Sequence, residues 1–231
     1  MRQNIIKLIC IVVIVFASWQ LINYFLTYEK VEQQEEELQQ EISFSSLNQF
    51  QKRYEDMVGW ITIDNTKVDY PIMQATNNEF YLTRNYKGEK LRAGSIFLDY
   101  RNDPSLRDRH SIIYGHDLRN GSMFGQLHRY EEQSFANSNR QFTIEIRNVL
   151  ITLEVFAAYQ TTTDFYYIET EFTSESYEQF IETIINKSAI TYEGNINVND
   201  QIITLSTCVS DNQSDERFVV HAKVVERKDI K

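Results

Sequence analysis

The chain has 231 residues, of which 42% are hydrophobic and 13% aromatic, with only 7 Gly and 2 Pro, which excludes a disordered protein. The formal net charge of −10 at pH 7, without any basic stripe, argues against nucleic acid as a partner, because phosphate binding needs clustered Lys and Arg. A chain of this length has room for one domain of ordinary size with appendages.

Residues 8–26 form the first predicted element, the apolar run LICIVVIVFASWQLINYFL. Its length is close to the roughly 20 apolar residues that a helix needs to cross a bilayer. Arg2 and Lys7 precede the run, and acidic residues follow it. By the positive-inside rule, this asymmetry predicts a cytoplasmic N-terminus over residues 1–7 and an extracellular remainder. We therefore expect a single-pass protein of the cell membrane, held in the plasma membrane by its N-terminal helix.

A cleaved signal peptide is the alternative for this segment. It requires a shorter apolar core and a small-x-small cleavage site. Here the bulky Trp19 directly follows Ala17 and Ser18, and the apolar character continues to Leu26. This pattern favours an uncleaved anchor.

Residues 27–44 are rich in Glu and Gln, which form helices readily but make the segment too polar for a core. We expect a polar helical stalk there, and a plain charged linker is the other interpretation. The remainder, residues 45–231, is predicted to be one globular extracellular domain.

The domain opens with a short predicted helix, since Leu47, Phe50 and Tyr54 fall at helical spacing. Short apolar or alternating runs rich in β-branched residues then follow, separated by polar turns. The predicted strands are residues 59–63, 68–73, 94–99, 111–115, 141–146, 150–160, 201–207 and 218–226. About eight strands at this spacing predict a mainly β domain, either a barrel or a sandwich.

Two predicted helices interrupt these strands. The first, over residues 122–130, is short. The second, over residues 174–186, is amphipathic, and Thr173 or Ser174 is suited to cap its first N–H groups. Its apolar face consists of Tyr177, Phe180, Ile181, Ile184 and Ile185. We expect this helix to pack against the sheet.

Three predicted strands carry residues suited to acyl transfer at their ends. One ends at Tyr114-Gly-His116, a second ends at Thr204-Leu-Ser-Thr-Cys208, and a third opens at Arg217. Strand ends and the loops beside them are where functional groups are commonly mounted on a rigid scaffold. If the second and third strands are neighbours, Cys208 and Arg217 lie at one end of the sheet.

These residue types fit thiol chemistry. A thiolate at Cys208 can attack a peptide carbonyl to form a thioester. An imidazole at His116 can carry the protons, and a guanidinium at Arg217 can donate hydrogen bonds to an oxyanion. The other cysteine, Cys10, lies in the apolar N-terminal run, so we expect no disulfide. We expect structural roles for the remaining histidines, His110, His128 and His221. For Asp117 we expect a solvated carboxylate, and tuning of the His116 imidazole is the alternative.

Together these segments resemble the signatures of the sortases, the cysteine transpeptidases of Gram-positive bacteria. The resemblance rests on Tyr114-Gly-His116, on the TLxTC pattern that ends at Cys208, and on Arg217-Phe-Val-Val, in the family's order. The segment Asn120-Gly-Ser-Met-Phe124-Gly and the long helix before the cysteine strand are similar to those of class B sortases. The resemblance covers nearly all of residues 45–226. It implies an eight-stranded sortase-type β-barrel with an N-terminal helix and that long helix as additions.

The resemblance also implies a function. His116, Cys208 and Arg217 would form the catalytic trio, with no cofactor and no metal. The enzyme would cleave the C-terminal sorting signal of a secreted surface protein after its Thr. It would then join the protein to an amine of the peptidoglycan stem or cross-bridge, in the wall or in its lipid-linked precursor. The substrate-binding residues implied by the family's groove are Asn78, Leu82, Thr163, Tyr167, Ile168 and Ser206. For Leu82 and Tyr167, a plain role in the core is the alternative.

Two other classes of protein stay open at this point. One is another thiol enzyme of the cell wall, such as an amidase or an L,D-transpeptidase, although the Ser-His-Gly-Cys run typical of the latter is absent from the sequence. The other is a non-enzymatic, membrane-anchored surface-binding domain. Such a domain would not need Cys, His and Arg at strand ends. Selective, pH-dependent labelling of Cys208 by a thiol probe would favour an enzyme.

Overall fold

The structure is a computed structural model that describes residues 2–44, 47–208 and 215–230. The chain divides into two compact units, Met1–Phe44 and Ser45–Lys231. The first unit is one helix, α1 (Arg2–Phe44), which contains both the apolar run and the polar segment after it. Among the described residues, α1 is the one helix that is long and apolar enough to cross a membrane, judged by length and composition alone.

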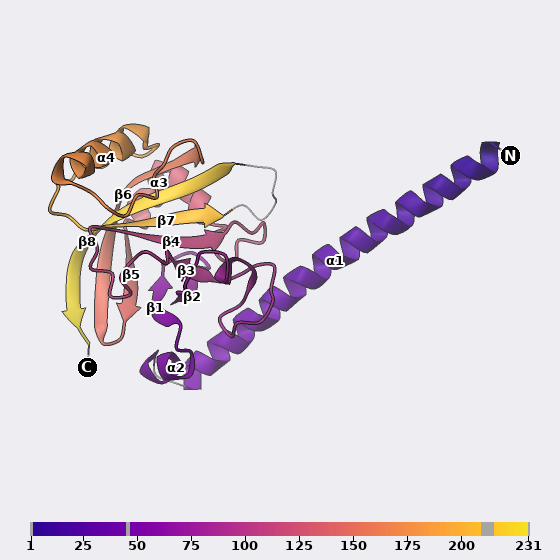
Figure 1. Cartoon of the computed structure of the whole chain (residues 1–231), viewed down its shortest axis with the longest axis horizontal. Helices are drawn as coiled ribbons and strands as arrows, with labels where there is room; N and C mark the ends of the chain where they lie inside the picture. The colour runs from indigo at the N-terminus through magenta and orange to yellow at the C-terminus, as the bar shows by residue number, and fades with distance from the viewer. Residues whose placement is uncertain (1, 45–46, 209–214, 231) are drawn as a thin grey trace. The chain divides into compact units, whose positions relative to one another are not determined.

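The second unit is built around a closed barrel of eight strands (Figure 1). The strands are β1 (Met57–Thr62), β2 (Asp69–Met73), β3 (Ile96–Leu98), β4 (His110–His116), β5 (Gln141–Ile146), β6 (Val149–Thr162), β7 (Ile202–Cys208) and β8 (Glu216–Asp229). Their order around the barrel is β1-β2-β3-β4-β7-β8-β6-β5, and β5 closes the ring by pairing with β1. The predicted mainly β barrel is therefore confirmed, and the closed ring decides against a sandwich.

Two of the strands that carry candidate catalytic residues, β4 and β7, are deeply buried. Every residue of β4 is buried, and so are residues 202–207 of β7. Each contains a short apolar run, at residues 112–114 and 202–203, and its polar residues are buried as well, because both faces of these strands are covered. In contrast, β5 alternates between more exposed and buried positions. The strands β4 and β7 therefore give the candidate site a rigid base.

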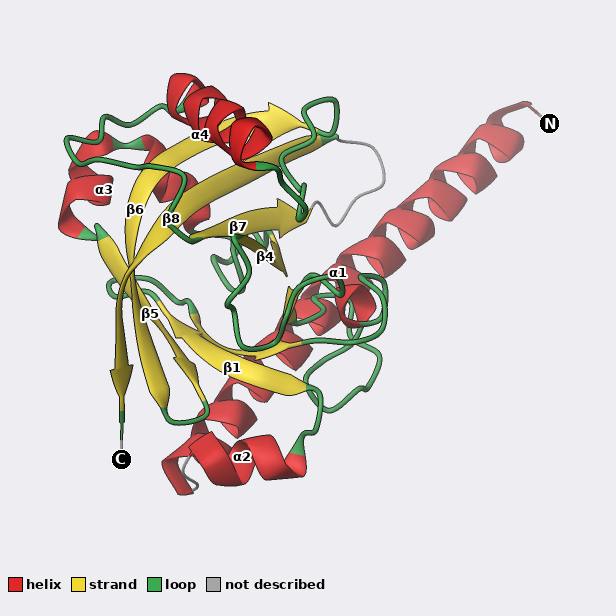
Figure 2. Ribbon diagram, turned by 60° about the vertical axis from the view of Figure 1, so that its left-hand side comes forward, coloured by secondary structure: helices red, strands yellow, loops and turns green. Residues whose placement is uncertain are grey.

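In the described part of this unit, five short helical elements accompany the barrel. They are α2 (Leu47–Arg53), η1 (Tyr81–Thr83), η2 (Leu127–Glu131), α3 (Gln133–Ser138) and α4 (Ser174–Lys187). The predicted helix before the first strand is confirmed as α2. The predicted amphipathic helix is confirmed as α4, which lies over β6 (Figure 2). Thr173 caps α4, since its hydroxyl accepts from the backbone N–H of Ser176 in a capping box.

The buried face of α4 is narrower than predicted. Tyr177, Phe180, Ile181 and Ile184 are buried and pack with β6, β7 and β8 in one apolar cluster. Ile185 is instead 44% exposed. It is the last member of the predicted apolar face and lies at the edge of the stripe, two residues before the helix ends at Lys187.

The predicted helix over residues 122–130 is wrong in its first half. Gly121 has φ +80° and Met123 has φ +53°, both in the left-handed region that a right-handed helix excludes. Helical structure begins only at Leu127 with η2, and the unpredicted α3 follows it. The apolar side chains of Phe124 and Leu127 are fully buried, as expected, but from a turn and a 3-10 helix.

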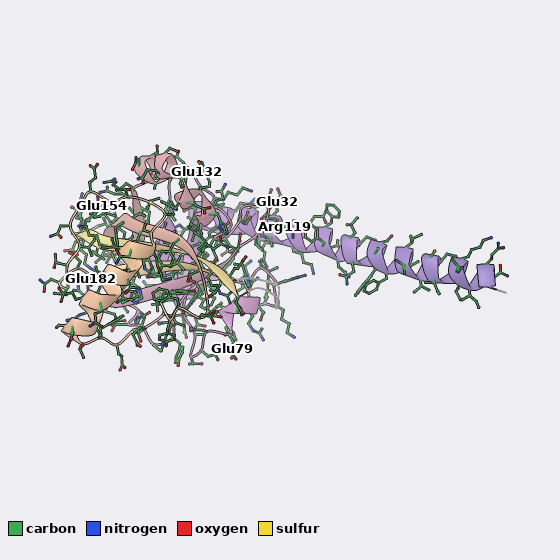
Figure 3. All side chains as sticks on the ribbon, turned by 90° about the horizontal axis from the view of Figure 1, so that it is seen from above. Glu32, Glu79, Arg119, Glu132, Glu154 and Glu182 are labelled. Carbon is green, nitrogen blue, oxygen red and sulfur yellow. The ribbon has the colours of Figure 1, made fainter. Side chains whose placement is uncertain are left out.

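Charged side chains lie mostly on the surface, where they can stay hydrated. Glu79, Glu132 and Glu182, from three different parts of the barrel unit, are examples of exposed carboxylates (Figure 3). The acidic balance of the chain is therefore carried by the solvated surface, and the interior holds few charges.

Candidate active site

The three candidate catalytic residues lie at one end of three adjacent strands. β4 and β7 are parallel neighbours, and their register pairs His116 with Cys208. β8 runs antiparallel to β7, with Ser206 opposite Val219. Continued for two residues, this register sets Arg217 opposite Cys208. The side chain of Cys208 and the loop residues 209–214 lie outside the part of the chain that the structure describes.

The ring of His116 is held by a backbone carbonyl. Its Nε2 lies 2.7 Å from the carbonyl oxygen of Leu82, and the residue is only 4% exposed. A carbonyl can only accept, so Nε2 carries the hydrogen. In the neutral ring, the lone pair is therefore on Nδ1, which is the nitrogen that can take up or release a proton.

This carbonyl is placed by a glycine in the following loop. Gly94 has φ +59°, and a Cβ there would come within 2.6 Å of the carbonyl oxygens of both Tyr81 and Leu82. Glycine adopts this positive φ without strain, and it alone leaves room for two carbonyl oxygens at this distance. The sequence predicts Leu82 as a substrate-binding residue but does not predict the contact of its carbonyl with His116, because a backbone contact leaves no residue-type signal in the sequence.

The glycine of the Tyr-Gly-His segment has a packing role. A Cβ at Gly115 would lie 2.7 Å from Cδ2 of Phe124. Phe124 is fully buried, and its N–H donates to the carbonyl of His116 at 2.9 Å. The histidine strand and the Asn120–Gly125 segment therefore interlock, which explains why both stood out in the sequence.

Arg217 is half-buried at the start of β8, opposite Thr161 of β6. Its Nη1 donates to the carbonyl of Glu216 at 2.7 Å. The next residue, Phe218, donates its N–H to Oγ1 of Thr207 at 2.8 Å, directly before the cysteine. The backbone at the start of β8 is thus tied to the end of β7.

Two of the predicted substrate-binding residues are in direct contact. The hydroxyl of Tyr167 lies 2.8 Å from Oγ of Ser206, and both residues are buried. Ile168, which directly follows Tyr167, is half-buried. Thr163 is exposed, and its N–H donates to the carbonyl of Asp215 at 3.2 Å. These four residues lie on β7 or on the connection between β6 and α4.

Asn78 takes part in a hydrogen-bond network around Asp99 that the sequence does not predict. Its Nδ2 donates to Oδ2 of Asp99 at 3.0 Å, and its Oδ1 accepts from the N–H of Tyr100 at 3.0 Å. Arg101 binds both carboxylate oxygens of Asp99 at 2.8 Å. Burial alone would raise the pKa of the Asp99 carboxyl, but the hydrogen bonds from Arg101 and Asn78 outweigh it and keep this pKa below its usual value.

The same arginine reaches the connection before α4. Its Nη2 donates to the carbonyl of Ile168 at 2.9 Å, and its Nη1 donates to the hydroxyl of Tyr166 at 3.2 Å. Arg101 therefore joins the segment after β3 to the segment that carries Tyr167 and Ile168. In the sequence, this network is indicated only by two opposite charges, Asp99 and Arg101, that follow the apolar strand β3.

His110 and His221 are both fully buried and lie away from this strand end, in line with the structural roles expected for them. His110 is at the opposite end of β4 from His116. Burial lowers the pKa of His110 to about 4. His128 lies on the surface, where it pairs with Asp117, so that carboxylate is bound to a histidine and not merely solvated.

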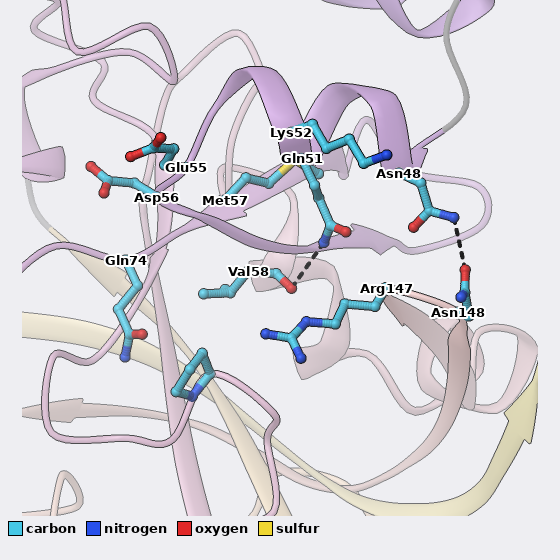
Figure 4. Close-up of a pocket in the computed structure, with 11 residues that line it drawn as sticks. Asn48, Gln51, Lys52, Glu55, Asp56, Met57, Val58, Gln74, Arg147 and Asn148 are labelled. Carbon is cyan, nitrogen blue, oxygen red and sulfur yellow. Dashed lines mark hydrogen bonds between the residues drawn. The ribbon is translucent and has the colours of Figure 1, made fainter.

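In the described part of the chain, neither a metal-ligand cluster nor the cavity near α2 lies at this end of the barrel. Among residues 2–44, 47–208 and 215–230, no three His, Cys, Asp or Glu side chains are grouped as metal ligands. A cavity of about 690 Å³ lies between α2, the start of β1 and the turn at Arg147 and Asn148 (Figure 4). None of the candidate catalytic or substrate-binding residues lines it.

Several known proteins are similar to this chain in sequence and in fold. The Sortase domain model matches residues 61–225. Sortase B of Listeria monocytogenes is 44% identical over 181 residues, which cover 78% of this chain and 74% of the relative. Sortase B of Staphylococcus aureus is 32% identical over 234 residues, which cover 96% of each chain.

Solved structures agree with these relatives. A Bacillus anthracis protein described as similar to sortase B has a TM-score of 0.71 at 47% identity, covering 77% of this chain and 81% of its own. A Staphylococcus aureus sortase B–substrate complex has a TM-score of 0.75 at 34% identity, covering 86% of this chain and 94% of its own.

Proposed function

Because the chain belongs to the sortase family, with class B members as its relatives, we propose that Cys208, His116 and Arg217 perform its transpeptidation. The protein is a sortase B-like cysteine transpeptidase, which acts on a sorting signal and a cell-wall amine. The assignment of steps to these three residues is the proposal.

In the first half-reaction, the thiol proton of Cys208 moves to Nδ1 of His116, and the resulting thiolate attacks the carbonyl carbon of the Thr in the sorting motif. The tetrahedral intermediate places a negative charge on the carbonyl oxygen, and the guanidinium of Arg217 donates hydrogen bonds to it. Loss of one such donor typically raises the barrier by about 3 kcal/mol. His116 gives its Nδ1 proton to the leaving amine as the C–N bond breaks, and a thioester remains.

In the second half-reaction, a peptidoglycan amine attacks the thioester carbonyl. His116 takes the proton of this amine back onto Nδ1, the new amide bond forms, and the C–S bond breaks to release the thiolate. The proton balance closes over the two steps. The observation that carries this account is the register that pairs His116 with Cys208 and, continued by two residues, sets Arg217 opposite the same cysteine.

The sorting signal is proposed to lie along Leu82, Thr163, Tyr167, Ile168 and Ser206. The hydrogen bond between the hydroxyls of Tyr167 and Ser206 holds these two side chains together beside the proposed groove. Asn78 supports the groove differently, because both ends of its amide are engaged by the Asp99–Tyr100 turn. It would shape the groove through the network that runs from Asp99 through Arg101 to Ile168.

The finer placement in the cell is also proposed. Residues 1–7 would be cytoplasmic, residues 8–26 would cross the plasma membrane, residues 27–44 would form the stalk, and residues 45–231 would be the extracellular catalytic domain. An apolar helix preceded by basic residues supports this arrangement. The amine would come from the peptidoglycan stem or cross-bridge, or from the lipid-linked precursor at the membrane surface.

The test is a peptide library offered to the full chain together with candidate wall amines, with the products identified by mass spectrometry. Cys208→Ala should abolish both cleavage and amide transfer while the protein stays folded. Cys10→Ala is the matched control, since it removes the other thiol and should leave turnover unchanged. Cleavage that persists in Cys208→Ala would end the proposal.

A further inference from the structure

Asp117 and His128 form a pair beside the proposed catalytic residues. Asp117 directly follows His116 in the chain, and its Oδ2 lies 2.8 Å from Nε2 of His128 on η2. Both side chains are partly exposed, with 36% of the aspartate and 43% of the histidine accessible. The contact therefore joins the loop after β4 to a separate helical element.

The other side of the histidine ring faces β8. The ring centroids of His128 and Phe218 are 4.7 Å apart. Phe218 is 1% exposed, directly follows Arg217, and bonds through its N–H to Thr207. Contacts thus run without a gap from the residue after His116, through His128, to the residue after Arg217 and the residue before Cys208.

Both ends of this path are firmly held. Asp117 pairs with Met123 in an isolated antiparallel bridge, which closes the loop between them. The helix η2 is fixed by Leu127 and Tyr130, which are fully buried, and the hydroxyl of Tyr130 donates to the carbonyl of Asn139 at 2.9 Å. A hydrogen bond between two anchored segments can transmit position, because neither side moves freely.

We propose that Asp117 and His128 are positioning residues for transpeptidation, which together hold the end of the His116 strand in register with the start of the Arg217 strand. This inference rests on the proposed function, because it takes His116 and Arg217 as reacting groups. Neither Asp117 nor His128 is assigned a proton-transfer step. Their effect is on the spacing between the imidazole and the guanidinium across the cysteine.

The pair is expected to depend on pH. The hydrogen bond that His128 donates to Asp117 raises the pKa of His128, partial burial opposes this, and the negative charges of Asp117 and Glu131 add to the rise. From β8, Glu216 and Arg217 are the charged neighbours of Phe218, and α3 contributes no charged residue. A charge-assisted hydrogen bond is stronger than a neutral one. The hydrogen bond between Asp117 and His128 is therefore stronger below the raised pKa of His128 and weakens as pH rises through this pKa.

The test compares Asp117→Asn, His128→Gln and the double variant in the full chain, with a library-selected sorting peptide and a wall amine. Each single change should lower kcat roughly 3- to 10-fold with little change in KM for the peptide, and the double variant should be no worse than either single one. The alkaline transition that His128 adds to the pH profile of kcat should disappear in both single variants. Glu131→Gln is the matched control, because it removes a nearby charge without breaking the bond, and it should keep normal kcat.

An NMR titration of the His128 ring provides a readout that does not depend on turnover. The pKa of His128 should lie above about 6.5 in the wild-type protein and fall towards that ordinary value in Asp117→Asn. A ring that titrates at its ordinary value, unmoved by Asp117→Asn, would overturn the pair, and so would additive losses of kcat. If Cys208→Ala is inactive while these variants behave as wild type, only the positioning pair fails. If Cys208→Ala still cleaves, the proposed function itself fails.

Discussion

At the scale of single residues, the orientation of His116 depends on one main-chain atom. The carbonyl of Leu82 accepts from Nε2 of the ring, and this leaves Nδ1 for proton transfer. The carbonyl is in turn packed against Gly94, where a Cβ would meet two carbonyl oxygens at 2.6 Å. A residue with no reactive group therefore controls which ring nitrogen of His116, the proposed proton carrier, is available.

This arrangement predicts the effect of Gly94→Ala. The new methyl group must push away the carbonyls of Tyr81 and Leu82, so His116 loses its fixed hydrogen-bond partner. We expect a kcat at least about 10-fold lower, together with a loss of stability that exceeds the roughly 1–2 kcal/mol cost of a left-handed alanine. Steady-state kinetics and urea unfolding measure the two effects.

Gly88→Ala is the matched control for this prediction. Gly88 also has a positive φ, of +80°, but nothing lies within 4 Å of a Cβ built there. This variant should show the stability cost of the backbone conformation alone and keep normal kcat. If Gly94→Ala and Gly88→Ala have the same kcat, the carbonyl of Leu82 does not orient the base.

At the scale of elements, a buried polar chain ties four adjacent strands together. It runs from His110 of β4 through Thr204 of β7 and His221 of β8 to Tyr159 of β6, with successive distances of 2.6, 2.7 and 2.8 Å. Nδ1 of His110 faces the carbonyl of Glu169 and must donate to it. Thr204 then donates to His110 and accepts from His221, and Tyr159 donates to His221. Every polar group is satisfied only while both rings are neutral.

This chain predicts acid sensitivity of the barrel. Burial lowers the pKa of His110 to about 4 and holds that of His221 well below its ordinary value. Both histidines take up protons near pH 6.5 when unfolded, so their contribution to stability is complete above that pH. As pH falls below about 6.5 this contribution is lost, by up to roughly 1.4 kcal/mol per pH unit for each histidine while its folded form stays neutral. Urea midpoints should therefore stay level from pH 7.5 to about pH 6.5 and decrease between there and pH 5.

His128 affects the pH dependence of stability with the opposite sign, because its pKa is raised. Since its side chain is partly exposed, solvent screens this effect. His221→Phe provides a variant with one fewer buried titrating ring, and its urea midpoint should depend less steeply on pH. A wild-type midpoint that stays flat over this range would show that the two rings are not held neutral.

Some helices and strands of this fold can be predicted from the sequence pattern, and others cannot. The periodicity of α4 and the apolar runs of β4 and β7 predicted those elements correctly, because burial on one face or on both leaves a direct pattern in the chain. The stretch over residues 122–130 was misread, since its apolar spacing suits a helix while Met123 adopts a left-handed φ that residue type does not reveal. The sequence does not predict the network of Asp99 and Arg101, because it joins loop segments that are distant in sequence.

At the scale of the whole molecule, the chain combines one apolar helix and one folded catalytic unit. Both substrates of a sortase belong outside the cytoplasm, so the proposed orientation of α1 decides whether the enzyme can meet them. Basic residues precede the apolar run and acidic residues follow it. This asymmetry predicts that the catalytic unit faces outward.

The orientation can be tested with single cysteines in a chain that carries Cys10→Ala and Cys208→Ala. In this background, Glu182→Cys lies on the exposed face of α4, and Gln3→Cys lies before the apolar run. A membrane-impermeant maleimide added to intact cells should label Glu182→Cys and should label Gln3→Cys only after the cells are permeabilised. The reverse pattern would contradict the topology. A mature protein that lacks the Gln3→Cys label even after lysis would instead indicate a cleaved signal peptide, since the residue itself would have been removed.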